Sequence, residues 1–215
     1  LFSEIALFQA VFLRSIITVP PVLMMVWVTK VTLQNLAKQD IRLILLRVGA
    51  EICTTIAFLT ALKYMPLANV TAILQALPLA VTMAAALFLA EPIGWRRWSA
   101  ILVGFMGVLI VVRPGLDGFN VYSLSALAAI IFITVREIAT RKLAQEVPTI
   151  TVVLSTAIGS AVFAGIMMVG AEWHAVSTSS WLLLIGAAFA VLIATLLSVM
   201  AMRTGEIGFV SPFRY

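Results

Sequence analysis

Long apolar runs alternate along this chain with short polar gaps, and most runs have the length of a helix that crosses a lipid bilayer. Such a helix needs about 20 mostly apolar residues. The pattern predicts seven crossings, with an eighth run beginning at Ile207 and reaching Tyr215. The seven are Ile5–Val28, Ile44–Tyr64, Leu67–Ala90, Trp98–Val112, Val121–Thr140, Thr149–Ala171 and Trp181–Met202. The gaps leave no room for a folded soluble domain, so we expect an all-α polytopic membrane protein.

The basic residues collect in every second gap, and this spacing predicts the orientation of the helices. They are Lys30, Lys38, Arg42 and Arg47, then Arg96 and Arg97, then Arg141 and Lys142, then Arg203. The other gaps hold Lys63 and Arg113 beside the acids Asp117 and Glu172. Because basic residues favour the cytoplasmic side, the first run is predicted to pass from outside to inside. Tryptophan prefers the membrane interface, and all five tryptophans lie near run ends, as this topology requires.

Composition supports the bilayer as solvent. The chain is 63% hydrophobic and 11% charged, whereas soluble domains are about 45–50% apolar and about 25% charged. The net charge of +5 is explained by topology, and no nucleic-acid partner is expected, since none of the short gaps offers a basic soluble face. Cys53 is the single cysteine, so an intrachain disulfide or a multi-cysteine metal site is excluded. No metal or cofactor is expected.

Four charged residues lie inside the apolar runs, where a charge costs roughly 2.5–3.5 kcal/mol and marks a functional candidate. They are Arg14, Glu51, Arg136 and Glu137. Arg14 follows Glu4 by ten residues, which places it roughly 15 Å from the outer end of its helix. It either contacts an anionic substrate or hydrogen-bonds the carbonyls of a neighbouring helix, and the sequence leaves both readings open.

Two of the other three charges have partners on their own helices in this interpretation. Glu51 follows Arg47 by four residues, so an i,i+4 pair is favoured over a buried carboxylate that takes up a proton. Glu137 is expected to form an i,i+4 pair with Arg141 in the same way. Arg136 and Glu137 point about 100° apart, so we expect no simple neutralisation between them. Arg136 therefore stays open as a substrate contact, while both glutamates are candidates for proton coupling.

Prolines interrupt two of the predicted helices. Pro78 frees the carbonyl of Leu74 one turn earlier, near the polar side chain of Gln75, which we take as a third substrate-binding candidate. Pro20 and Pro21 are expected to interrupt the first run in the same way. Two interrupted helices favour a cavity over a simple kink, because transporters expose unwound backbone to their substrates.

Residues 61–75 and 201–215 form a faint repeat. Five crossings separate its copies, so they run in opposite directions, and inverted repeats are a common transporter architecture. The matching pairs are Ala61 with Ala201, Lys63 with Arg203, Val70 with Val210, and Thr71 with Ser211.

Several short motifs occur in a characteristic order. They are Phe12-Leu13-Arg14, then Ala61 to Tyr64 followed by Ala68 and Pro78, then Glu91-Pro92, then Gly104 to Gly115, and then Arg136-Glu137-Ile-Ala-Thr-Arg141-Lys142. In these residues the chain resembles the drug/metabolite transporter superfamily, specifically its EamA-like branch. The resemblance implies ten helices in two inverted repeats of five, about eight of them represented here. Residues 1–113 would hold helices 2–5 of the first repeat, and residues 114–215 helices 6–8 and the start of helix 9, so a helix is expected to be missing at each end.

The predicted function is secondary transport of a small metabolite or drug across the plasma (inner) membrane by alternating access, with export favoured by the resemblance. The expected partners are the lipid bilayer and a small-molecule metabolite, with a homodimer left open. An enzyme is not expected, because the single histidine, His174, lies in an outer gap and no Gly-x-Ser-x-Gly motif occurs. A structural or receptor-like membrane protein is the alternative, although it leaves the deep Arg14 unexplained.

Overall fold

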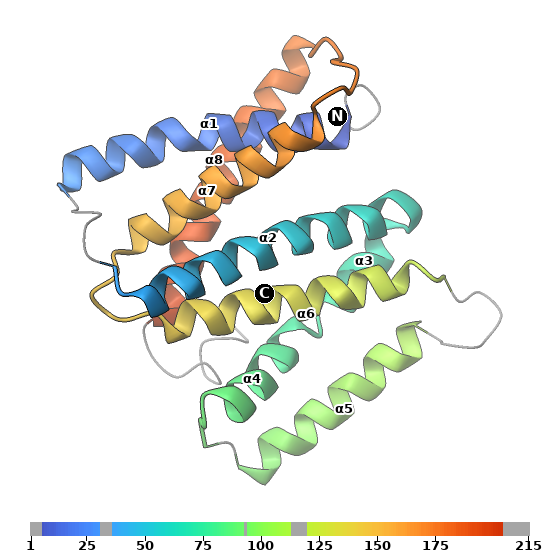
Figure 1. The fold of residues 1–215 in the computed structure, drawn as a ribbon. Coiled ribbons are helices and arrows are strands. Elements are labelled where there is room, and N and C mark those ends of the chain that lie inside the picture. Colours follow the sequence, from blue (N-terminus) through green and yellow to red (C-terminus); the bar gives the residue numbers. More distant parts are fainter. Residues whose placement is uncertain (1–5, 31–35, 93, 113–119, 204–215) are drawn as a thin grey trace. The chain divides into compact units, whose positions relative to one another are not determined.

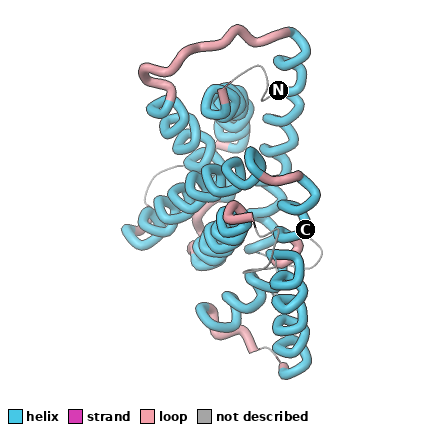
Figure 2. Tube along the Cα trace, turned by 90° about the vertical axis from the view of Figure 1, so that its right-hand side faces the viewer, coloured by secondary structure: helices cyan, strands magenta, loops and turns pink. Residues whose placement is uncertain are grey.

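A computed structural model describes residues 6–30, 36–92, 94–112 and 120–203. These residues form helices joined by short connections, and none of them is in a strand (Figures 1 and 2). The helices are α1 (Leu7–Thr29), α2 (Lys38–Tyr64), α3 (Leu67–Leu74), α4 (Leu77–Phe88), α5 (Trp95–Val112), α6 (Ser123–Lys142), α7 (Thr149–Met167) and α8 (Thr178–Arg203). The all-α prediction is confirmed.

The helices follow the predicted apolar runs. Within the described part of the chain, six helical segments are long and apolar enough to cross a membrane, and α3 and α4 together form one of them, Leu67–Phe88. Helix α5 lies over the crossing predicted at Trp98–Val112 but is not among the six. The eighth run, from Ile207, lies outside the described residues, as do Glu4, Arg113 and Asp117.

The prolines act differently in the two helices where a break was predicted. Helix α3 ends at Leu74, and Pro78 lies in the first turn of α4, so the crossing is interrupted as expected. Helix α1, in contrast, continues through Pro20 and Pro21 from Leu7 to Thr29. The predicted interruption of the first run is therefore wrong. A proline removes one backbone donor, and a helix continues past it when the rest of the segment keeps its geometry.

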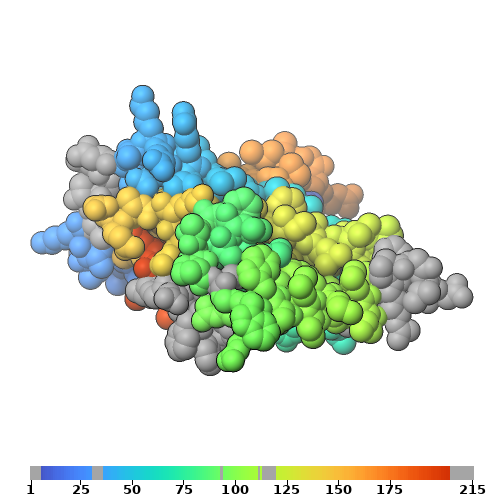
Figure 3. Space-filling view, turned by 90° about the horizontal axis from the view of Figure 1, so that it is seen from below, coloured from blue at the N-terminus to red at the C-terminus, as the bar shows by residue number. Residues whose placement is uncertain are grey.

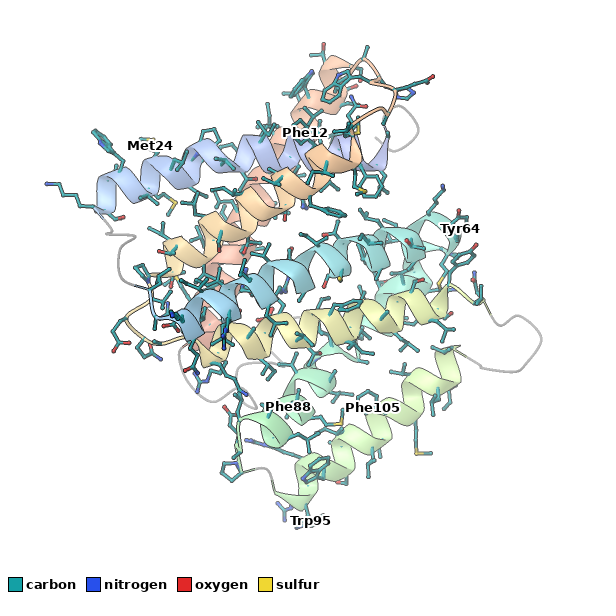
Figure 4. The ribbon with its side chains drawn as sticks, viewed as in Figure 1. Phe12, Met24, Tyr64, Phe88, Trp95 and Phe105 are labelled. Carbon is teal, nitrogen blue, oxygen red and sulfur yellow. The ribbon has the colours of Figure 1, made fainter. Side chains whose placement is uncertain are left out.

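The chain divides into two compact units. The first comprises Leu1–Val48 and Leu143–Met200, and within it α1 packs along α7. Gly165 of α7 permits this approach, because a Cβ there would lie 3.0 Å from the Phe12 ring, labelled on α1 in Figure 4. Apolar side chains from α1, the start of α2, α7 and α8 form its larger core. The fully buried members of that core are Val22, Val152, Val153 and Val199.

Buried polar side chains anchor the connections of this first unit. Gln9 is fully buried, donates from Nε2 to the carbonyl of His174 at 2.7 Å, and accepts from the His174 amide at 3.2 Å. Asp40, in the first turn of α2, accepts from the amide of Ala144 at 3.1 Å. The two bonds of Gln9 tie α1 to the connection that precedes α8. The bond of Asp40 ties α2 to the connection that precedes α7.

The second unit comprises Gly49–Lys142 and Ala201–Tyr215. Its core lies where α3 and α4 pack against α6, with α5 packed against α3 and α4. Phe105, labelled in Figure 4, packs from α5 against this core. The fully buried members of the core include Ala61, Val70, Ile73, Val81, Ala126 and Met202.

Large apolar side chains remain exposed on most helices. Figure 3 shows residues of α4 and α5, coloured green, on one such face. On these two helices Phe88 is 64% exposed and Ile110 is 69% exposed. A water-soluble protein rarely exposes so many large apolar groups, whereas a bilayer solvates them. The fold is therefore that of a polytopic helical membrane protein.

Candidate functional site

Three of the four predicted intramembrane charges meet in the second unit. Arg136 and Glu137 come from α6, and Glu51 comes from the part of α2 that belongs to this unit. The guanidinium of Arg136 donates from Nη1 to Glu51 Oε2 at 2.6 Å. It also donates from Nη2 and Nε to Glu137 Oε1, at 2.7 and 3.2 Å. All three guanidinium nitrogens thus face carboxylates, and we call Glu51, Arg136 and Glu137 the charged cluster.

The two carboxylates of the charged cluster have different surroundings. The side chain of Glu137 is 2% exposed, and its Oε1 atom accepts two bonds from Arg136. The side chain of Glu51 is 18% exposed, and its Oε2 atom accepts from one nitrogen of Arg136. Short charge-assisted bonds of this kind are strong in a water-poor environment. Glu137 therefore fixes the guanidinium, while Glu51 lies on its more accessible side.

The charged cluster corrects two pairings inferred from the sequence. Arg136 contacts Glu137 directly, because its long side chain bridges the angle between neighbouring helical positions. Arg141 was assigned to Glu137 at i,i+4, but it lies 3.8 Å from Glu91 and donates to the Met202 carbonyl at 3.1 Å.

Sequence reasoning also missed the contact between α2 and α6. It favoured Arg47 as the partner of Glu51, and the structure places Arg136, 85 residues along the chain, against the Glu51 carboxylate. The pairing of Glu51 with Arg47 stays a prediction. Arg47 belongs to the first unit, where it is 2% exposed and its Nη1 donates to Thr156 Oγ1. Arg136 is therefore occupied by two carboxylates, which leaves it poorly suited to binding an anionic substrate.

The remaining predicted site residues lie elsewhere. Arg14 is half-buried on α1 of the first unit, and its carbonyl accepts from Thr18 Oγ1 at 2.9 Å. Gln75 is exposed at the C-terminal end of α3, at the break before α4. The structure therefore gathers one of the three substrate-binding candidates, Arg136, with both proton-coupling candidates.

A buried hydroxyl near the charged cluster escaped the sequence analysis. Thr54 lies three residues after Glu51 on α2, a spacing that places both side chains on the same helix face. It is 9% exposed, and its Oγ1 atom has no hydrogen-bond partner among the described residues. Buried hydroxyl groups nearly always have partners, so this one is unusual. A threonine within an apolar run carries too weak a signal to identify from sequence.

The fold and the charged cluster define the class of this protein, a polytopic membrane protein with ionisable groups inside its spanning helices. Such groups commonly mark substrate or ion pathways. The chain belongs to the EamA-like transporter family, whose model matches residues 1–113. The resemblance inferred from the motifs is thereby confirmed.

Relatives with named functions are transporters. The chain is 31% identical, over 182 residues, to the riboflavin transporter of Vibrio cholerae, a match that covers 84% of this chain and 61% of that protein. It is 32% identical, over 101 residues, to the S-adenosylmethionine uptake transporter of Rickettsia bellii, covering 47% of this chain and 35% of that protein. The chain thus spans less than two thirds of the length of either relative.

A solved crystal structure shares the fold. The TM-score is 0.77 at 19% sequence identity, and the match covers 98% of this chain and 75% of the other.

Proposed function

We propose that the protein is a secondary transporter that imports a small heterocyclic metabolite, with riboflavin as the first candidate, across the plasma membrane by alternating access. The observation that carries transport is the charged cluster inside the spanning helices of an EamA-family chain. A purely structural membrane subunit has no need for buried charges that are costly to insert. The similarity to a riboflavin transporter over 84% of the chain supports the substrate.

The direction proposed here differs from the export favoured by the motifs. Several relatives, from Rickettsia bellii and Rickettsia felis among others, carry names that specify uptake. These names support import, and import is therefore the direction to test first. Lipid and a small molecule are the proposed partners, and a homodimer remains a prediction.

Arg14 and Gln75 are the proposed polar contacts for the substrate. Gln75 is exposed beside the helix break, and Pro78, four residues after Leu74, has no N–H to donate to the Leu74 carbonyl. A side-chain amide and an unwound backbone offer donors and acceptors to the polar edge of a heterocycle. Arg136 is assigned instead to holding the two carboxylates.

S-adenosylmethionine uptake is the second candidate, and one observation favours it. The charged cluster holds two carboxylates and one guanidinium, which gives the three groups a net charge of −1 when all are ionised. S-adenosylmethionine carries a cationic sulfonium group, which such a cluster attracts. Riboflavin is neutral and gains nothing from that charge.

The test uses the full-length transporter, purified and reconstituted in proteoliposomes. Liposomes loaded with unlabelled riboflavin should exchange it for labelled riboflavin outside, and unlabelled S-adenosylmethionine is added as competitor. Riboflavin exchange that S-adenosylmethionine does not inhibit supports the first candidate. Exchange of S-adenosylmethionine, with no exchange of riboflavin, supports the second. Absence of both exchanges, with empty liposomes as the control, contradicts the proposed function and returns weight to a structural or receptor-like role.

A further inference from the structure

We propose that Tyr64 and Tyr122 form a binding site that stacks the planar heterocycle of the substrate, while the ammonium group of Lys63 donates to an acceptor oxygen of the same molecule. These three residues and Asn120, which positions the two tyrosines, are called the tyrosine platform. The inference rests on the proposed function and adds a site of first contact at the ends of two helices. Both candidate substrates carry the chemistry required, a flat heteroaromatic ring and carbonyl or carboxylate oxygens.

The two tyrosine rings are stacked. Tyr64 is the last residue of α2, where Figure 4 labels it, and Tyr122 directly precedes the first residue of α6. Their ring centroids lie 4.1 Å apart and their planes are 13° from parallel. The other aromatic pairs of the described residues, both in the first unit, meet edge to face at 6.2 Å. The tyrosine pair therefore has the geometry that a third flat ring can continue.

A single side chain holds the backbones of both tyrosines. Asn120 donates from Nδ2 to the Tyr64 carbonyl at 3.1 Å, and its Oδ1 accepts from the Tyr122 amide at 2.9 Å. The end of α2 is thereby tied to the start of α6, 56 residues further along the chain. A site whose parts are fixed in advance loses less conformational freedom when it binds a ligand. The stack is thus preorganised by bonds that do not involve the rings.

The tyrosine platform is accessible and carries a positive charge. Tyr64 is 47% exposed, Lys63 is exposed, and Tyr122 is half-buried. The Nζ atom of Lys63 lies 5.3 Å from the centre of the Tyr64 ring, and it takes part in none of the ion pairs between described residues. A cation over an exposed ring is held weakly, so this ammonium group is free to bind an oxygen of the ligand.

Membrane anchoring is the ordinary role of exposed aromatic residues at helix ends. Tyrosine and tryptophan rings suit the headgroup level of a bilayer. An anchor needs contact with lipid alone, and neither a stacked neighbour nor a bond that fixes two backbones. Trp181 shows this simpler arrangement, since it is 40% exposed near the start of α8 and stacks on no other described ring. The stack and its Asn120 bonds therefore favour a binding role for the tyrosines.

The position of the tyrosine platform suits a substrate that arrives from outside. The gap after Lys63 is one of those that the distribution of basic residues predicts to face outward. A substrate stacked there is bound before the steps that carry it across the membrane. Removing such a site weakens binding and leaves the maximal rate of transport unchanged.

The test measures exchange by the full-length transporter in proteoliposomes over a range of riboflavin concentrations, or of S-adenosylmethionine if the wild type exchanges only that metabolite. Tyr64→Leu and Tyr122→Leu should each raise the half-saturating concentration about fivefold through loss of ring stacking. Lys63→Met, which loses one hydrogen bond, should raise it about threefold. The maximal exchange rate of all three variants should stay within about twofold of the wild type.

Control variants separate stacking from folding and from anchoring. Tyr64→Phe keeps the ring and should match the wild type, as should Trp181→Leu, which removes an exposed aromatic residue from another helix end. A wild-type maximal rate at saturating substrate shows that a variant is folded. If neither leucine variant inserts, an unchanged half-saturating concentration in Lys63→Met contradicts the proposal, and a rise supports it.

Three outcomes overturn the inference while leaving the proposed function intact. The first is an unchanged half-saturating concentration in both leucine variants. The second is a lowered maximal rate with no change in half-saturation, as expected if the tyrosines are structural. The third is an equal effect of Trp181→Leu, as expected if the rings only anchor the protein in lipid. Failure of the wild type to exchange either metabolite contradicts the proposed function itself.

Discussion

At the scale of single residues, Arg136 shows how a buried charge is made tolerable in a spanning helix. Its guanidinium is shared between Glu51 and Glu137 at 2.6 and 2.7 Å. Removing one member of such a buried group leaves the others without compensation, which is strongly destabilising. Arg136 is therefore assigned a structural role within the charged cluster.

Replacement of Arg136 by glutamine should destabilise the protein by about 3–5 kcal/mol, because both carboxylates would lose the guanidinium that binds them in a buried site. Adding Glu137→Gln in the same chain should recover part of that loss. The exposed Arg96, at the start of α5, provides the matched control Arg96→Gln. The thermal unfolding midpoint in detergent is the measurement. If Arg136→Gln unfolds at the wild-type temperature, the cluster contributes no stability.

Arg14 carries a different prediction, because it lies on α1 of the first unit and is half-buried there. Arg14→Ala should lower substrate exchange by about tenfold or more, which corresponds to about 1.4 kcal/mol of lost interaction, while membrane insertion stays intact. Arg42→Ala, at an exposed position near the start of α2, is the control. Normal exchange by Arg14→Ala would show that Arg14 is structural and not a substrate contact.

At the scale of elements, the two proline-containing spans show the limit of sequence rules. The segment Leu67–Phe88 breaks at Gln75 and Ala76, where the Ala76 amide donates to the Ile73 carbonyl at 3.0 Å. Helix α1 continues through its two adjacent prolines. A proline costs backbone hydrogen bonds in either case, but packing around the segment decides whether the helix ends. The break in the second span is thus a local feature, and Gln75 is exposed beside it.

Helix packing in the second unit gives a stability prediction. A Cβ on Gly104 of α5 would collide with the Leu79 side chain of α4, whereas a Cβ on Gly107 would meet no atom within 4 Å. Gly104→Val should therefore lower stability by about 1–3 kcal/mol through overpacking, and Gly107→Val should cost less. Thermal unfolding of the two variants in detergent compares the same chemical change at both sites. Equal losses would show that α4 and α5 do not pack as described.

At the scale of the whole molecule, the distribution of basic residues makes the topology testable. In a Cys53→Ser background, single cysteines are placed at His174, before α8, and at Gln145, before α7. A membrane-impermeant thiol reagent applied to intact cells should label the first and not the second, because basic residues favour the cytoplasmic side. A third site, Asp117, lies outside the described residues and is also expected to label. The reverse pattern would overturn the predicted orientation.

The division into repeats is a prediction at this same scale. The motifs place the boundary between residues 113 and 114, whereas the compact units combine Leu1–Val48 with Leu143–Met200, and Gly49–Lys142 with Ala201–Tyr215. Compact units reflect which helices pack together, and repeats reflect shared ancestry, so the two need not coincide. The inverted-repeat architecture remains a prediction.

The sequence by itself determined that a lipid bilayer surrounds the helices, and it gave the approximate helix positions and the family. It also identified the four charges that are costly to place in a bilayer. These follow from composition and from spacing along one helix, which act locally. Only the tertiary structure decided that Glu51 meets Arg136, that Arg141 meets Glu91, and that Thr54 is buried without a partner. Helical periodicity specifies neighbours within one turn, whereas partners 85 residues apart are fixed by how α2 and α6 pack.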